Sequence, residues 1–442
     1  MSDGVVITGL GAVTPFGVGA SALWDGLLEG RSALTRIARF DPSGFDCRLA
    51  GEAEGFSARD FVPKAYRKAV KVMARDIELA VGAAHDAVRD AGLSTRGQPL
   101  ADGADPTYPP RRVGCHIGAG LIAADLDELT AALASGVDER GEFSLARWGD
   151  AEGGAGAMGN LTPLWLLKYL PNMLACHVTI IHDAQGPSNT ITCAEASGLL
   201  SVGESMRVIE RGEADACFTG GAENKVTPMG LVRMGLAGRL AATGDEADGS
   251  RVVRPYDPAS AGGLLGEAGG IVVAERESTA RARGARVYAR LVGAGSGHAP
   301  RSDDPAVRAR GLANAIRAAL RNAGLEPADV GAILPHASGV PSLDAEEAEA
   351  LRAVFGGSLA SIPLVTLTPA IGDAMAGFGG VATAVAALCL HHRTLPARLH
   401  AGAPAEGLDA GPAPARDAAV SNALVCAGAL GGQAAAIVLS SA

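Results

Sequence analysis

Three ionisable side chains in this sequence each follow a short, largely apolar run. They are Glu195, His336 and Asp373. Two carboxylates and one imidazole form a general acid/base set if the fold brings them into one pocket. Each residue also has an ordinary structural explanation. Either carboxylate can cap the helix that follows it, and a lone buried histidine is often a hydrogen-bonded core residue.

The seven cysteines offer a second kind of chemistry, as thiolate nucleophiles, metal ligands or disulfides. They are scattered and contain no CxxC pair, which argues against a zinc pattern and against a compact disulfide framework. No histidine spacing suggests metal binding. We therefore expect no metal and a reducing compartment. Cys193, two residues before Glu195, is interpreted as a small packed residue.

Composition restricts the class of protein further. The chain has 442 residues, a formal net charge of −10, 60 glycines, and only 4% aromatic residues. A 48% hydrophobic content supports a large core, and the negative charge argues against nucleic acid as the main partner. We see no apolar run of about 18 residues and no basic leader, so we expect no membrane span and a cytoplasmic protein.

Along the chain, apolar runs typical of strands alternate with amphipathic helical stretches. This alternation predicts βαβ units in both halves. A faint echo between residues 216–221 and 424–428 favours a duplicated α/β fold, and the glycine-rich residues 134–160 are expected to form a surface insertion. Strands are expected at 5–8, 112–117, 180–181, 190–193, 216–219, 271–274, 287–292, 332–334, 364–367, 424–425 and 436–439. Helices are expected at 71–92, 196–211, 305–324, 342–355 and 377–390.

Three segments carry a family resemblance in order and spacing. They are Val6–Pro15, Gly186–Gly198 and Arg254–Asp257. Together they resemble the β-ketoacyl-ACP synthases of the thiolase superfamily, most closely synthase II and the type II polyketide ketosynthase subunits. The resemblance covers nearly the whole chain and implies a usually dimeric thiolase fold with a duplicated five-layer αβαβα architecture. The implied halves are residues 1–257, with a flap or insertion at about 134–170, and residues 258–442.

The resemblance fails at the catalytic positions. Glu195 stands where condensing members have the nucleophilic cysteine, Thr368 replaces the family lysine, and Asp373 replaces the second histidine, while His336 is retained. A glutamate is a poor acyl acceptor, and two carboxylates would repel a malonyl carboxylate. The family's gating phenylalanine is absent from the loop Leu430, Gly431 and Gly432. The resemblance places the apolar segment 161–170, with Trp165, beside the acyl tunnel and the dimer interface, and a core helix is the equal alternative.

Three functions remain open. The first is a non-condensing subunit, similar to a chain-length factor, that pairs with an active ketosynthase and shapes the acyl tunnel. The second is a repurposed acid/base enzyme that uses Glu195, His336 and Asp373 for dehydration, cyclisation or hydrolysis of carrier-bound acyl chains. The third is an active β-ketoacyl-ACP synthase that uses Cys193. The resemblance leaves open a homodimer or a heterodimer with a cysteine-bearing ketosynthase.

A cluster of basic residues gives one clue to a partner. Lys64, Arg67, Lys68 and Lys71 lie on one predicted helical stretch of an acidic chain. The matching region of the synthases borders the docking site for acyl carrier protein, which is itself acidic. The alternative is an ordinary solvated helix face. The resemblance implies no cofactor other than the phosphopantetheine arm on which the carrier protein presents its substrate.

Overall fold

A mixed sheet of ten strands forms the centre of the protein. The computed structural model describes residues 3–149, 156–300 and 302–442. The strands of this sheet are β1 (Val5–Thr14), β2 (Gly17–Val18), β5 (Val113–Ala119), β6 (Ser188–Ile191), β7 (Ala216–Glu223), β9 (Ala268–Arg276), β10 (Ala289–His298), β11 (Ala332–Pro335), β14 (Asn422–Gly428) and β15 (Gln433–Ser440). Their order is β11-β14-β15-β10-β1-β9-β7-β5-β6, with β2 beside β1. Two smaller sheets contain β3 (Leu34–Arg36), β4 (Leu49–Gly51) and β8 (Leu265–Gly266), and β12 (Thr394–Leu395) and β13 (Arg416–Asp417).

The α-helices cover the outer faces of this sheet and also lie between its two halves. They are α1 (Ala20–Leu28), α2 (Arg75–Asp90), α3 (Leu126–Ser135), α4 (Leu145–Gly149), α5 (Met173–His182), α6 (Ser197–Glu210), α7 (Pro228–Leu236), α8 (Glu277–Ala282), α9 (Pro305–Ala323), α10 (Pro341–Phe355), α11 (Thr368–Ile371) and α12 (Phe378–His392). Four short 3-10 segments also matter below: η2 (Lys64–Val72), η5 (Trp165–Tyr169), η6 (Ala194–Ala196) and η10 (Met375–Gly377).

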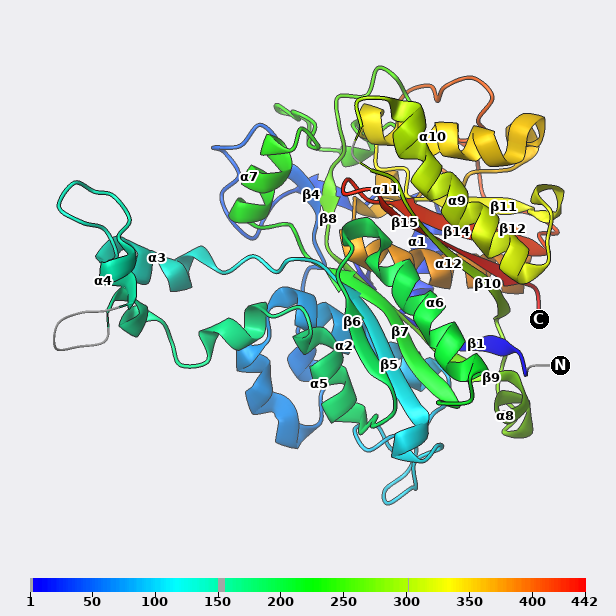
Figure 1. Cartoon of the computed structure of the whole chain (residues 1–442), viewed down its shortest axis with the longest axis horizontal. Coiled ribbons are helices and arrows are strands. Elements are labelled where there is room, and N and C mark those ends of the chain that lie inside the picture. Colours follow the sequence, from blue (N-terminus) through cyan, green and yellow to red (C-terminus); the bar gives the residue numbers. More distant parts are fainter. Residues whose placement is uncertain (1–2, 150–155, 301) are drawn as a thin grey trace.

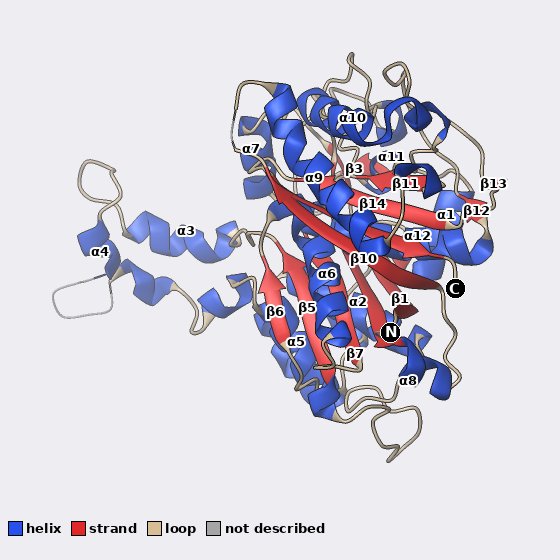
Figure 2. Ribbon diagram, turned by 45° about the vertical axis from the view of Figure 1, so that its right-hand side comes forward, coloured by secondary structure: helices blue, strands red, loops and turns tan. Residues whose placement is uncertain are grey.

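The elements stack in five layers. Helices α2 and α5 cover the outer face of the half-sheet β6-β5-β7-β9-β1, and α9 and α10 cover the outer face of the half-sheet formed by β10, β15, β14 and β11. Helices α6 and α12 pack against each other and contact strands of both half-sheets. Figures 1 and 2 show the strands running between these helices. The predicted α/β fold with αβαβα layers is confirmed, whereas the boundary at residue 257 stays a prediction.

The two middle helices begin in the same unusual way, which supports the predicted duplication. Ala194 and Met375 have φ angles of 47° and 50°, a backbone region that non-glycine residues rarely adopt. Each is the first residue of a 3-10 turn, and these turns lead into α6 and α12, respectively. The two helix starts then meet backbone to backbone, because a Cβ on Gly198 would lie 2.8 Å from the Ala376 carbonyl oxygen. This contact brings the segments of Glu195 and Asp373 together.

Helix α12 is an apolar helix that lies buried in the core from Phe378 to Leu390. By length and composition, Met375–His392 could cross a membrane, and 89% of that stretch is buried inside the protein. It is the central helix between the two half-sheets. The expectation that no apolar run reaches the length of a membrane span is therefore wrong. The run exists because α12 is a core helix with apolar residues on all sides.

Several predicted elements differ from the structure. Residues 180–181, predicted as extended, lie in α5, because packing on α2 and β5 overrides the strand preference of two isoleucines. Residues 364–367 form no regular strand, and Leu364 makes only isolated bridge pairing with Ile333. The helix predicted to begin at residue 71 begins at Arg75.

The predicted insertion is partly helical. Helices α3 and α4 belong to an arm that stands away from the body of the protein in both views (Figures 1 and 2). Residues 150–155 of this insertion, and Met1 and Ser2 of the predicted N-terminus, lie outside the described residues.

Candidate functional site

The three predicted ionisable residues meet at the centre of the fold, together with an arginine that sequence reasoning missed. Glu195 lies on η6 after β6, His336 follows β11, and Asp373 lies between α11 and η10. Arg239 enters the same place from the loop after α7. All four side chains are buried. We call Glu195, Arg239, Asp373 and His336 the buried quartet.

Ion pairs connect the buried quartet in a chain. The Arg239 guanidinium donates from Nη1 to Glu195 Oε1 in a very short contact, and from Nη2 to Asp373 Oδ2 at 3.1 Å. His336 Nε2 lies 2.9 Å from the other oxygen of Asp373. Among the described residues, Glu195 Oε2 has no hydrogen-bond partner. Arg239 therefore links two carboxylates that the resemblance places at catalytic positions.

The electrostatics favour the charged forms of His336, Asp373 and Arg239. Burial works against a protonated imidazole, but the Asp373 carboxylate outweighs burial and raises the pKa of His336 to about 9. Burial likewise opposes ionisation of Asp373, but His336 and Arg239 hold the pKa of this carboxyl well below its usual range. The carboxylates of Glu195 and Asp373 keep the pKa of Arg239 above its ordinary value despite burial. Two anions then balance two cations, so a buried site can hold four charges.

A second layer of contacts holds His336 in place. The backbone N–H groups of His336 and Ala337 donate to Glu347 at 3.0 and 2.8 Å, and the Tyr256 hydroxyl donates to the same carboxylate at 2.7 Å. The imidazole also packs edge-on against Phe378, with ring centroids 5.1 Å apart. These contacts fix the ring so that Nε2 faces Asp373.

Thr368, at the family lysine position, has a structural contact. Its side chain is buried, and its hydroxyl donates to the carbonyl oxygen of Ala337. Ala337 has a φ of 50°, so this bond ties down a strained residue beside His336. The resemblance gave Thr368 only the place of the family lysine, and its bond to Ala337 was not predicted.

Neither carboxylate is the N-cap of the helix that follows it, because η10 and α12 begin after Ala374 and Gly377 and have no side-chain capping bond. Glu195 does not cap the following helix, since neither η6 nor α6 has a side-chain capping bond. Its carboxylate turns to Arg239 because a buried anion gains more from a cation than from one backbone donor. Asp373 does accept from the Met375 N–H at 2.9 Å, in addition to its two ion pairs.

The predicted gate residues separate in the structure. Leu430 and Gly432 line a cavity of about 70 Å³ that His336 also lines, whereas Gly431 does not line it. Pockets for ligands are typically about 300–1,000 Å³, so this space is too small for a long acyl chain. Trp165 lies on η5 at the arm and packs on Tyr169, with ring centroids 5.7 Å apart. It lines neither this cavity nor a second, larger cleft of about 810 Å³.

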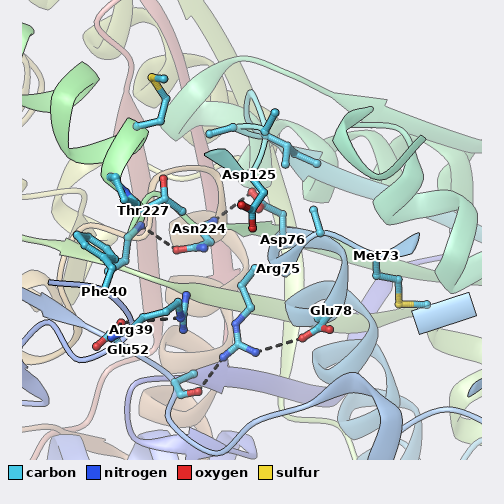
Figure 3. A pocket seen from close by; sticks show the side chains of 18 of the residues that line it. Arg39, Phe40, Glu52, Met73, Arg75, Asp76, Glu78, Asp125, Asn224 and Thr227 are labelled. Atoms are coloured by element: carbon cyan, nitrogen blue, oxygen red, sulfur yellow. Dashed lines mark hydrogen bonds and ion pairs between the residues drawn. The ribbon is translucent and has the colours of Figure 1, made fainter. Parts of the chain in front are cut away.

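A larger cleft of about 810 Å³ was not predicted, and it contains no residue of the buried quartet. It lies between the start of α2, the loop after β4, the segment after β7 and the base of the arm (Figure 3). Most of its charged groups are already paired. Arg75 donates to Glu78 at 3.2 Å and to the fully buried Glu267, which Arg39 also binds. No single motif could reveal this cleft, because distant segments supply its lining.

The four predicted docking residues lie together on the surface. Lys64, Arg67, Lys68 and Lys71 are exposed on η2, a 3-10 segment rather than the predicted α-helix. We call these four residues the basic ridge. The segment is anchored from behind, where the Tyr66 hydroxyl lies 2.7 Å from His177 Nδ1. Within the described part of the chain, none of the four forms an ion pair.

The cysteines form no site among the described residues. All seven are free thiols, and no group of three or more histidine, cysteine or acidic side chains could hold a metal ion there. Cys193 is partly buried and packs against the hydrophobic core. Burial raises the pKa of its thiol, which disfavours the thiolate needed for nucleophilic attack.

A five-layer fold with two facing helix starts and a buried ionisable residue near each is typical of a ketosynthase-like protein. Comparison with known proteins agrees. The family described as "Beta-ketoacyl synthase, N-terminal domain" matches residues 2–280, and "Beta-ketoacyl synthase, C-terminal domain" matches residues 288–402. The chain is 30% identical over 407 residues to 3-oxoacyl-[acyl-carrier-protein] synthase 2 of Vibrio harveyi, covering 92% of this chain and 90% of that protein. It is also 30% identical over 401 residues to the Staphylococcus aureus synthase 2, covering 90% and 88%.

Solved structures show the same fold. The ishigamide ketosynthase/chain length factor aligns with a TM-score of 0.81 and 26% identity, with both chains fully covered. A type II polyketide ketosynthase in complex with its acyl-carrier protein, bound to the hexaketide, aligns with a TM-score of 0.81, 22% identity and full coverage of both chains. This chain therefore belongs to the β-ketoacyl synthase family. It is a ketosynthase-like protein of fatty acid or polyketide biosynthesis.

Proposed function

We propose that this chain is a non-condensing, chain-length-factor-like subunit that pairs with a cysteine-bearing β-ketoacyl synthase. The observation that carries the proposal is the place of Glu195. At the position where the resemblance places the family nucleophile, the fully buried Glu195 side chain contacts Arg239, and this residue carries no thiol. A carboxylate bound in this way is a poor acyl acceptor. Asp373 engages His336 Nε2, so this nitrogen is not available to polarise a thioester carbonyl.

Two surfaces support a paired subunit. Strand β6 is the last strand of its half-sheet, its first two residues are exposed, and it leads directly to Glu195. An exposed edge strand is a ready site for pairing with another chain. The arm also exposes a series of large apolar side chains that a monomer would leave in water. These are Leu126, Leu133, Phe143, Leu145, Met158, Leu164 and Leu166.

The basic ridge supports an acyl carrier protein as the second partner. Four exposed cations without pairing among the described residues can attract an acidic protein to one face of an otherwise acidic chain. In this arrangement the substrate stays on the phosphopantetheine arm of the carrier, and this chain needs no cofactor of its own. We place the complex in the cytoplasm, where free cysteines stay reduced.

Co-expression tests the proposal. The chain is produced with a ketosynthase from the same operon that retains its catalytic cysteine and both histidines, and the molar mass of the purified species is measured by light scattering. A stable 1:1 complex is expected. Purification only as a homodimer, with no binding to such a ketosynthase, would refute the proposed subunit role.

Edge pairing through β6 supplies a sharper version of this test. The Cys115 N–H donates to the Pro187 carbonyl, so alternation places the Thr190 N–H on the side away from β5. Thr190→Pro removes that donor and should weaken the complex, whereas the matched Thr190→Ala variant retains it. Equal complex formation by both variants would exclude pairing through this edge.

The other two functions stay predictions with less structural support. An acid/base enzyme requires a group that reaches the substrate, but each ionisable residue of the buried quartet is buried and paired with another, and of its carboxylate oxygens only Glu195 Oε2 lacks a hydrogen-bond partner among the described residues. If it is correct, Glu195→Gln and His336→Ala abolish product formation without unfolding the protein. A condensing enzyme that uses Cys193 requires alkylation of that thiol by an epoxide inhibitor of ketosynthases, which an intact mass would show.

A further inference from the structure

Arg239 is the residue of the buried quartet that no sequence pattern singles out. It stands between Gly238 and Leu240 in the loop after α7, where an arginine normally extends into solvent. Its side chain is nevertheless only 6% exposed. The guanidinium spans Glu195 and Asp373, which come from opposite halves of the duplicated fold.

The backbone around Arg239 is held firmly. The Arg239 N–H donates to the Met234 carbonyl at 3.0 Å, and the Arg239 carbonyl accepts from the Gly263 N–H at 2.9 Å. The neighbouring Gly262 has a φ of 130°, and a Cβ there would lie 2.7 Å from the Ala241 nitrogen. Only glycine allows this close approach. The loop thus holds Arg239 in one position and directs its side chain inward.

The surroundings of Glu195 show why a cation is needed there. A buried carboxylate without compensation is strongly unfavourable, and among the described residues the Glu195 carboxylate contacts only Arg239. The second oxygen of Glu195 has no hydrogen-bond partner. The buried carboxylate of Glu267 differs, since it accepts hydrogen bonds from Arg39, from Arg75 and from the Ala53 N–H. Glu195 therefore depends on one cation, whereas Glu267 does not.

We propose that Arg239 is a positioning residue that closes this site, by holding Glu195 in the place of the nucleophile and Asp373 against His336. The proposal rests on the proposed non-condensing function and extends it. Loss of condensation chemistry then involves Arg239 in addition to the replacements at residues 195, 368 and 373. Restoring a cysteine at position 195 alone leaves a guanidinium facing Asp373. A direct consequence is that removal of the Glu195 side chain creates a small carboxylate-binding site in front of Arg239.

Formate rescue tests this consequence. Glu195→Ala is unfolded thermally in rising sodium formate, with sodium chloride at equal ionic strength as the reference. A ligand that binds only the folded state stabilises it by linkage, so above its dissociation constant each tenfold rise in formate should lower the unfolding equilibrium constant about tenfold. The Glu195→Ala/Arg239→Met double variant should show no response to formate beyond that to chloride. An equal response in both variants, or none in either, would overturn the proposal.

A charge-balance cycle keeps the proposal testable if Glu195→Ala does not fold. Arg239→Met leaves Glu195 without a cation, and Glu195→Gln leaves Arg239 and His336 sharing the one anion Asp373. Each should raise the unfolding equilibrium constant on the order of 100-fold. The double variant keeps Asp373 paired with His336 and should lose much less than the product of the two single effects. Arg251→Met is the matched control, because Arg251 lies exposed on the surface and should change the constant less than about threefold. Strictly additive losses would overturn the proposal.

These results are separable from the function of the chain. A failed formate rescue with an additive cycle rejects Arg239 as the positioning residue even if the 1:1 complex with a ketosynthase forms. A failed complex with intact rescue leaves the role of Arg239 standing and rejects the subunit function.

Discussion

The buried quartet and the basic ridge each gather charged side chains, but in opposite environments. In the buried quartet, Asp373 lies between Arg239 and His336, and all four side chains are withdrawn from water. On the basic ridge, Lys64 and its three neighbours stand in solvent on η2 without ion pairs among the described residues. The resemblance gave a catalytic meaning to every member of the buried quartet except Arg239, and a carrier-docking meaning to the basic ridge.

The difference shows how environment decides what a charge can do. Buried charges must be balanced by each other, so a change at one member is felt by the rest and by the whole fold. Exposed charges contribute little to stability and remain available for a partner. We therefore interpret the buried quartet as a closed structural centre and the basic ridge as a recognition surface. The predictions below test this contrast, beginning with the largest expected effect on stability.

Asp373→Asn should have the largest effect. Asp373 binds both His336 and Arg239, so its neutralisation leaves two buried cations with one anion. Breaking a buried ion pair in this way typically costs about 3–5 kcal/mol of unfolding free energy. Urea unfolding measures the loss, and Lys64→Met on the basic ridge is the control with no measurable change. Equal stability of both variants would remove the contrast between the two regions.

The pH dependence of stability should report the His336–Asp373 pair. The folded-state pKa of His336 is raised from 6.5 to about 9, so the folded protein holds a proton there that the unfolded chain releases. Stability from this pair is complete below about pH 6.5 and is lost as pH rises through about 9. The expected slope between these values is about 1.4 kcal/mol per pH unit.

The matched variant for this measurement is His336→Gln, which lacks the titrating group and should lose that slope. The low pKa of Asp373 acts in the opposite direction, since its contribution is present at neutral pH and disappears only in strong acid. A wild-type stability that is flat from pH 6.5 to 9 would contradict the protonated state of His336.

Thr368→Val should have an intermediate effect. The substitution keeps the shape of the side chain but removes the hydroxyl that donates to Ala337, and leaves that buried carbonyl without this partner. We expect a loss of about 1–3 kcal/mol in unfolding free energy. Thr368→Ser retains the hydroxyl and should recover part of the loss. If the Thr368→Val and Thr368→Ser variants are equally stable, the bond from the hydroxyl to Ala337 does not support the strained turn beside His336.

Charge reversal on the basic ridge should leave stability unchanged and weaken binding of the carrier. Lys64→Glu/Lys68→Glu is expected to lower the affinity of the complex for acyl carrier protein by about tenfold or more at low salt, with a smaller difference at high salt. Arg251→Glu is the matched control for a single reversal on another exposed surface. Carrier binding that is unchanged in the double variant would leave the basic ridge as a solvated face.

The fold could be predicted further than the site. Alternating patterns and glycine turns place α6, α9 and α10 within a residue or two of their observed bounds, because these helices have clear amphipathic faces or stops. The error at residues 180–181 arose because β-branched residues favour strands locally, while tertiary packing selects a helix.

The site could be predicted only where a residue keeps its place in a motif. Glu195, His336 and Asp373 do so, and the structure brings them together. Arg239 does not, because it lies 44 residues after Glu195 and its inward direction depends on loop contacts made through Gly262 and Gly263. The place of Trp165 beside an acyl tunnel stays a prediction of the resemblance, since its ring packs on Tyr169 and lines neither described cavity.

Intact mass spectrometry of the reconstituted complex tests the central claim most directly. The complex of this 44.3 kDa chain with its cysteine-bearing ketosynthase is incubated with acyl-loaded carrier protein, and the mass of each subunit is measured without reduction. We predict an acyl adduct on the ketosynthase partner and an unchanged mass for this chain, because no thiol stands at position 195. An acyl adduct on this chain, at Cys193 or elsewhere, would contradict the account.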